Sequence, residues 1–98
     1  MAGKRPPSKL SRAAKKLWLA IAAEIELDAG AELILTLLCE AVDRRQEARD
    51  AIRKNGAVCE DRFKQQKPSP WVAIERDTTL AVQRSYHALG LDLVPPEN

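Results

Sequence analysis

The stretch AELILTLLCEAV, residues 31–42, decides the fold, because it is apolar on nearly every side. Its apolar residues cannot share one stripe of a helix: Leu33, Ile34, Leu35, Leu37, Leu38, Cys39, Ala41 and Val42. A helix that is apolar all round must be covered on more than one side. In a chain of 98 residues the helices before and after it cover two sides, so a neighbouring subunit is the natural cover for the rest. The sequence therefore predicts an all-α homo-oligomer; the alternative is a three-helix monomer in which both neighbours suffice.

The central helix is expected over 31–54, with a first helix before it over 12–27. Gly56 follows the last helix-favouring residues, and glycine can adopt the left-handed conformation that closes a helix. Ser11 is placed to cap the first helix, and Asp28 is placed to cap the central one. The apolar residues of the first helix recur at helical spacing: Leu10, Ala14, Leu17, Trp18, Ile21 and Ile25.

A polar connector and a third helix follow the central helix. We expect a short extended or hairpin-like excursion over 57–63, where helical periodicity is lost. Ser69 and Pro70 then stand where an N-cap and a first helical residue belong, since proline has no backbone N–H to leave unpaired there. They predict a third helix over 70–89, which Trp71 is expected to pin to the core.

The chain divides into three parts. Residues 1–9 combine glycine, two prolines and charges, so we expect a disordered basic arm. Residues 10–91 form a single helical oligomerisation domain, and residues 92–98 form a short tail. With 45% hydrophobic residues but only four aromatic ones, the apolar content is mostly aliphatic, which suits small-residue helix packing.

The net charge of +2 hides an uneven distribution. The remainder of the chain carries ten basic and fourteen acidic residues. Residues 1–16, in contrast, carry no acid and six basic residues: Lys4, Arg5, Lys9, Arg12, Lys15 and Lys16. Positive charge early in the first helix opposes the helix macrodipole, which indicates that these charges serve a partner. A basic segment of this kind is typical of contact with a phosphate backbone; the alternative is a solvated tail.

Nucleic-acid binding is expected to be sequence-tolerant. A helix-turn-helix around Asp28 would require polar side chains in the first turns of the following helix, and those turns read AELILTLL. We therefore exclude that motif and expect phosphate contacts from the N-terminal cluster and from three residues of the connector. The predicted DNA-binding residues are Lys4, Arg5, Lys9, Arg12, Lys15, Lys16, Arg62, Lys64 and Lys67.

No pattern in the sequence predicts catalysis. There is one histidine, His87, which we interpret as a surface or packing residue, and no glycine-rich phosphate loop. Asp43 and Glu47 share a helical face with arginines, which indicates a solvated ion-pair network. Cys39 is interpreted as a small buried hydrophobe and Cys59 as a free thiol, so neither zinc nor another metal is expected. We expect no enzyme activity, cofactor, small-molecule substrate or membrane span.

Several short motifs occur together in this chain. They are Leu10-Ser11, the run Ala14 to Lys16, Trp18, Cys39-Glu40-Ala41, Gly56 and Val58, Pro70, and LGL at 89–91. In this order and spacing, from about residue 10 to 91, the chain resembles the small terminase subunit family of tailed bacteriophages, in the branch whose first helix carries the Leu-Ser, Lys and Trp residues. The connector departs from the glycine-rich connector of many relatives, since it carries Glu60, Asp61 and Arg62.

The resemblance implies a non-enzymatic adaptor of viral genome packaging in the host bacterial cytoplasm. Family members assemble as rings, engage double-stranded viral DNA and deliver it to, or regulate, the large terminase, which carries the ATPase and nuclease. The central helix would then supply the subunit interface, for which we expect Leu33, Leu35, Leu37, Leu38 and Val42. The alternative is a small helical protein-interaction or regulatory module that binds no nucleic acid.

Overall fold

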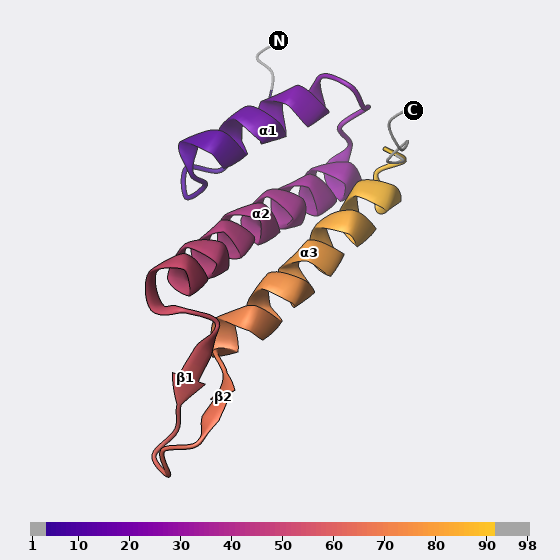
Figure 1. Ribbon diagram of the computed structural model, residues 1–98. Coiled ribbons are helices and arrows are strands. Elements are labelled where there is room, and N and C mark those ends of the chain that lie inside the picture. Colours follow the sequence, from indigo (N-terminus) through magenta and orange to yellow (C-terminus); the bar gives the residue numbers. More distant parts are fainter. Residues whose placement is uncertain (1–3, 92–98) are drawn as a thin grey trace, which may run out of the picture.

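Three helices and one small hairpin make up the fold (Figure 1), which was analysed in a computed structural model that describes residues 4–91. The order is α1 (Arg12–Ala22), α2 (Ala29–Asn55), β1 (Val58–Glu60), β2 (Gln66–Pro68) and α3 (Pro70–Ala88). The mostly helical class predicted from the sequence is confirmed. The predicted tail at 92–98 and the first three residues of the predicted arm lie outside the described residues.

Helix α1 begins as predicted and ends earlier than predicted. Ser11 is its N-cap, and the Ser11 Oγ accepts a hydrogen bond from the N–H of Ala14 at 3.0 Å. The helix ends at Ala22 rather than at residue 27, and the N–H of Glu24 donates to the carbonyl of Ile21 in a tighter turn. Late acidic residues oppose the macrodipole, so the helix gains little by continuing, and the turn brings the chain back toward α2.

Helix α2 carries the caps that the sequence indicated. The Asp28 side chain accepts a hydrogen bond from the N–H of Ala31 at 2.8 Å, and the helix starts at Ala29, slightly before the predicted start. Its last turn is closed at Gly56, whose φ of 87° lies in the region that favours glycine. These caps define both ends of α2: the chain enters from α1 at Asp28 and leaves toward the hairpin at Gly56.

The expected excursion after α2 is a β-hairpin. Strands β1 and β2 pair antiparallel, with Val58 opposite Pro68 and Glu60 opposite Gln66. The N–H of Ser69 donates to the carbonyl of Ala57 at 2.8 Å and extends the pairing to the base of α3. In Figure 1 the hairpin projects beyond the end of the α2–α3 pair, away from α1.

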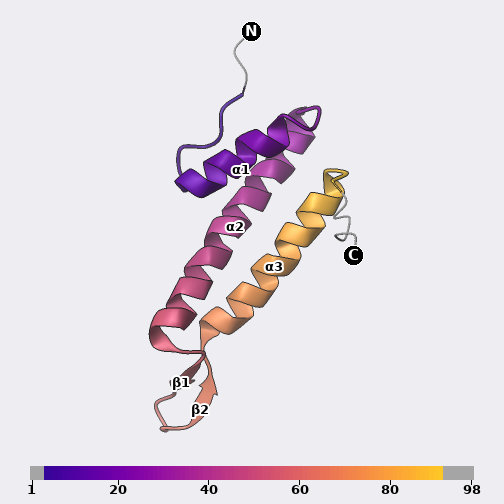
Figure 2. The same cartoon turned by 45° about the horizontal axis from the view of Figure 1, so that its top comes forward.

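Helix α3 starts at the predicted cap. The Ser69 Oγ accepts from the N–H of Trp71 at 3.3 Å, and Pro70 takes the first helical position. The helix ends at Ala88, and Gly90, with φ of 77°, turns the chain so that the N–H of Leu91 reaches the carbonyl of Tyr86 at 3.1 Å. Figure 2 shows α3 running antiparallel beside α2, while α1 crosses the first half of α2.

The core lies between α1 and the first half of α2. Trp18 is fully buried there, and its indole N–H lies 3.4 Å from the Thr36 hydroxyl. Cys39 is buried, as predicted, and Cys59 is a free, half-buried thiol. The residues of this core are Leu10, Ala14, Trp18, Ile21, Leu35, Leu38 and Cys39. Val82, Tyr86, Leu89 and Leu91, from α3 and its end, pack against its edge as partly buried residues.

Trp71 corrects one expectation about the core. We expected it to pin α3 among buried side chains, but it is only half-buried, and none of the described residues of α3 is fully buried. The Arg44 guanidinium carbon lies 4.9 Å from the centre of the Trp71 ring and covers one of its faces. The second half of α2 is too rich in arginine to offer an apolar surface at this position, so Trp71 meets a cation instead of a core.

Candidate nucleic-acid and assembly surfaces

The start of α1 is held by a carboxylate from α2. The backbone N–H of Ser11 donates to Asp43 Oδ2 at 2.8 Å, and the Ser11 hydroxyl donates to Asp43 Oδ1 at 2.5 Å. No acidic residue occupies the first turn of α1. Asp43 therefore supplies from another helix the negative charge that a helix N-terminus favours. This contact, rather than the ion-pair network expected for Asp43, fixes how the basic start of α1 is presented.

The N-terminal basic residues differ in how free their charges are. The Lys4 ammonium lies 3.1 Å from Glu32 Oε1 and 3.1 Å from the carbonyl oxygen of Leu27, so this charge is engaged within the chain. Lys15 is half-buried on α1. Lys4 is exposed although it is paired, and the other exposed members of the group are Arg5, Lys9, Arg12 and Lys16. Residues 4–9 contain no helix or strand, and the disordered arm predicted for 1–9 stays a prediction.

The hairpin holds its loop without glycine. The Asp61 carboxylate accepts hydrogen bonds from the N–H of Phe63 at 2.8 Å and from the N–H of Gln65 at 3.0 Å. The N–H of Lys64 donates to the Asp61 carbonyl at 2.9 Å, and the Asp61 N–H donates to the Gln65 carbonyl at 3.0 Å. An aspartate that bonds to nearby backbone amides replaces the conformational freedom that a glycine-rich connector provides. The hairpin therefore forms although the connector departs from the glycine-rich pattern of many relatives.

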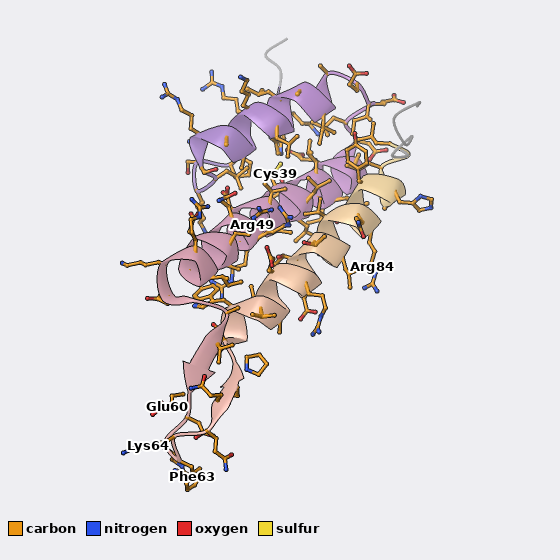
Figure 3. All side chains as sticks on the ribbon, viewed as in Figure 1. Cys39, Arg49, Glu60, Phe63, Lys64 and Arg84 are labelled. Carbon is orange, nitrogen blue, oxygen red and sulfur yellow. The ribbon has the colours of Figure 1, made fainter. Side chains whose placement is uncertain are left out.

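The hairpin carries three cations and an aromatic ring, here called the hairpin tip and defined as Arg62, Phe63, Lys64 and Lys67. Arg62, Phe63 and Lys64 lie in the loop between the strands, and Lys67 lies in β2 opposite Cys59. Phe63 is 69% exposed, the most exposed large hydrophobic side chain among the described residues. The Arg62 guanidinium carbon lies 5.0 Å from the centre of the Phe63 ring. Figure 3 shows Phe63 and Lys64 at the outermost end of the hairpin, beyond Glu60.

The predicted DNA-binding residues form two groups in one chain rather than a single surface. One group runs from Lys4, beside the start of α2, to the first turns of α1, and the other lies on the hairpin that projects beyond the far end of α2 (Figure 1). The sequence named Arg62, Lys64 and Lys67 and left out Phe63. The signal that could have identified Phe63 is its position between two basic residues, Arg62 and Lys64, in a polar connector.

The predicted interface residues separate into two classes. Leu35 and Leu38 are buried in the core of the chain itself, so they have no surface left for a second subunit. Val42 is half-buried and packs against the same core. Leu33 and Leu37, one turn apart on α2, are 61% and 51% exposed. These last two are the predicted interface residues that remain open to a neighbour.

The contact between α2 and α3 is largely polar in its middle. Arg45 Nε donates to the Thr79 hydroxyl at 2.7 Å, and Arg49 Nε lies 3.7 Å from Glu75 Oε2. An open groove of about 690 Å³ lies beside this seam. It is lined by Arg45, Val72, Glu75, Arg76, Thr79, Leu80 and Gln83. Arginine stems and half-buried aliphatic side chains hold the two helices together here without forming a closed core.

The described residues were searched for a reactive thiol and for a metal site. Burial, with a smaller contribution from the charge of Asp43, raises the pKa of the Cys39 thiol to about 11. A thiol with so high a pKa is a poor nucleophile and a poor metal ligand near neutral pH. Within residues 4–91, no three His, Cys, Asp or Glu side chains are grouped closely enough to hold a metal ion. None of the helices described there combines the length and apolarity needed to cross a membrane.

Comparison with known proteins identifies the family. The profile of the family described as phage terminase, small subunit, matches residues 14–94, which is most of the chain. Comparisons with curated proteins and with solved structures gave no match. The match includes most of α1, all of α2, the hairpin and α3. Of the N-terminal basic residues it includes Lys15 and Lys16, because it begins at residue 14. The chain belongs to the phage terminase small-subunit family.

Proposed function

We propose that this chain assembles into a homo-oligomeric ring, engages double-stranded viral DNA and delivers it to, or regulates, the large terminase subunit during genome packaging. In this proposal the small subunit catalyses no reaction itself and acts in the host bacterial cytoplasm. The ATPase and nuclease activities belong to the large subunit.

The observation that carries the proposal is the incomplete cover of α2 and α3 in a single chain. Leu33 and Leu37 are mostly exposed on α2, and α3 has no fully buried residue among those described. Leu80 of α3, 42% exposed, lies on the groove beside α2. Apolar side chains on two different helices favour head-to-tail contacts, in which one surface of a subunit meets another surface of the next, and such contacts close into rings.

Positive charge supports the contact with DNA. The exposed residues Arg5, Lys9, Arg12 and Lys16 lie in the segment before α1 and in the first turns of α1, and the hairpin tip adds three more cations. Repetition around a ring multiplies each group, so phosphate contacts that are weak in one chain add up across the assembly. Lys4 and Lys15 are predicted to contribute less, because one is paired with Glu32 and the other is half-buried.

Native mass spectrometry with and without duplex DNA from a viral genome end tests the proposal. We expect a closed oligomer of several subunits, and a heavier complex when DNA is added at low salt. The double variant Leu33→Gln and Leu37→Gln is expected to dissociate the oligomer, while Leu19→Gln, a similarly exposed leucine on α1, serves as the control. A protein that stays monomeric across micromolar concentrations would contradict the assembly.

A gel shift at two salt concentrations tests the DNA contact separately. Binding through phosphates is expected to weaken steeply as salt rises. It is expected to be lost when seven basic residues are changed to Gln: Arg5, Lys9, Arg12, Lys16, Arg62, Lys64 and Lys67. An oligomer that binds no duplex DNA even at low salt would instead support the protein-interaction module considered as the alternative.

A further inference from the structure

The hairpin tip presents an apolar ring where the fold itself makes no use of one. Phe63 is 69% exposed, it lies outside the core and its partly buried periphery, and its contact with another side chain is with the Arg62 guanidinium. The backbone bonds of Asp61, not the Phe63 ring, close the loop. The ring is therefore dispensable for the hairpin and costly to leave in water.

The backbone of the hairpin tip is strained at Lys64. Lys64 has a φ of 61°, and it is the one residue other than glycine with positive φ among those described. This position follows a turn closed by the bond from Lys64 N–H to the Asp61 carbonyl, and glycine or asparagine would adopt it with less strain. A lysine here keeps a positive charge at the end of the hairpin at the expense of local stability.

We propose that the hairpin tip stacks Phe63 on a DNA base while Arg62, Lys64 and Lys67 bind the flanking phosphates. The inference rests on the proposed DNA engagement and specifies how one of the two basic groups makes it. Aromatic side chains stack on bases with little dependence on sequence. Apolar wedges at the ends of DNA-binding elements insert between base steps of a duplex in a similar way.

Charge favours DNA over a pocket on another protein as the occupant. Arg62 lies against the ring, Lys64 follows it in the loop and Lys67 lies on β2. The Asp61 carboxylate is turned into the loop, where two backbone N–H groups bind it. An apolar pocket that received Phe63 would have to accommodate these cations as well. Phosphates on either side of a base neutralise them without further groups.

The shape of the hairpin allows the approach. Its two strands are three residues each, and it projects from the helices with Phe63 at its outer end (Figures 1 and 3). Two-stranded ribbons enter the grooves of a duplex in other DNA-binding proteins, and those that wedge an apolar side chain between base steps do so from the minor groove. Helices α2 and α3 then remain outside the groove, because they meet the hairpin at its other end.

The test uses the full-length protein and DNA that carries the fluorescent base 2-aminopurine, placed either inside a duplex or in a single-stranded overhang. Phe63→Ala is compared with Phe63→Tyr, which keeps an aromatic ring, and with Val58→Ala, which removes an exposed apolar side chain from the strand of the same hairpin. We expect the wild type to change the probe's fluorescence on binding, and Phe63→Ala to lose this change and on the order of tenfold in affinity.

The controls decide what each outcome means. Phe63→Tyr and Val58→Ala are expected to retain the fluorescence change and the affinity. A change in the duplex probe assigns stacking at a base step, and a change in the overhang alone assigns stacking on an unpaired base; both support the proposal. If Phe63→Ala binds with wild-type affinity and the same fluorescence change, the inference is wrong while salt-dependent binding by the wild type still upholds the proposed function. If the wild type binds neither DNA at low salt, both are wrong.

Discussion

Helices α1 and α3 both pack against α2, but only α1 completes a core there. Helix α1 contributes Ala14, Trp18 and Ile21 to the fully buried cluster, although it has 11 residues. Helix α3 has 19 residues and contributes none that is fully buried. Its contact with α2 combines partly buried apolar residues, such as Val82 and Tyr86, with arginine contacts, such as the bond from Arg45 to Thr79.

The difference follows from the two halves of α2. The first half is apolar on several sides, so it can bury α1 and still expose Leu33 and Leu37. The second half carries Arg44, Arg45 and Arg49, which contact Trp71, Thr79 and Glu75 of α3 while their charges stay in contact with water or with partners. A single chain therefore has one closed contact and one open contact along the same helix. We infer that the stability of the single chain depends mainly on the first contact, and that the proposed assembly uses apolar side chains that neither contact covers, such as Leu33 and Leu37.

Two tryptophans give the largest test of this difference. Trp18→Ala removes a fully buried indole and is expected to lower the free energy of unfolding by roughly 3 to 5 kcal/mol. Trp71→Ala removes a half-buried ring beside Arg44, so we expect a loss of about 1 to 2 kcal/mol. Urea unfolding followed by circular dichroism, at one fixed protein concentration, measures both. Equal losses would contradict the division into a closed and an open contact.

Protein concentration sharpens the same comparison. If a second subunit covers α3, the loss caused by Trp71→Ala will grow with protein concentration, because the interaction between subunits then contributes to stability. The loss caused by Trp18→Ala will not change in this way.

The buried thiol of Cys39 makes the stability of the core between α1 and α2 depend on pH. Burial raises the pKa of Cys39 from 9.0 to about 11, so the folded state holds the thiol protonated. Its contribution to stability is complete below pH 9 and is lost as pH rises toward 11, by roughly 2 to 3 kcal/mol in all. Cys39→Ala should flatten this part of the stability curve. At pH 8 iodoacetamide should modify Cys59 in the folded protein and Cys39 only after unfolding.

The cap of α1 gives a smaller effect. Asp43→Asn removes the charge that accepts both the Ser11 N–H and the Ser11 hydroxyl, and we expect it to cost about 1 to 2 kcal/mol. Glu47→Gln, four residues further along α2, removes only an exposed pair with Arg44 and is the matched control. If the two variants unfold at the same urea concentration, the interhelix cap contributes nothing to stability.

The sequence predicted the features whose causes are local. Ser11, Asp28 and Ser69 each cap a helix through a bond to a backbone N–H two or three residues away, and Gly56 closes α2 by its own conformation. Such contacts depend only on neighbours in the chain. The order of the helices and their approximate bounds were predictable for the same reason.

The remaining features depend on partners far apart in the sequence. The bond from Ser11 to Asp43 spans 32 residues, and the Arg44–Trp71 contact joins two helices. The pattern of residues 31–42 showed that several sides of α2 are apolar, but it did not show that α1 would cover Leu35 and Leu38 and leave Leu33 and Leu37 exposed. That choice is made by the position of α1, which no residue on α2 specifies alone.

The smallest expected effect on stability is at Lys64, a residue with a strained backbone in the loop of the hairpin. Lys64→Gly should relieve the positive φ and stabilise the hairpin by about 0.5 to 1 kcal/mol, seen as slower hydrogen exchange of the Gln65 amide, which is bonded to Asp61. The same variant removes a phosphate contact, so its affinity for DNA should fall and its salt dependence should become shallower. Lys64→Arg keeps the charge and the strain and should change neither property. A glycine variant that gains stability and keeps full DNA affinity would show that the lysine is not retained for binding.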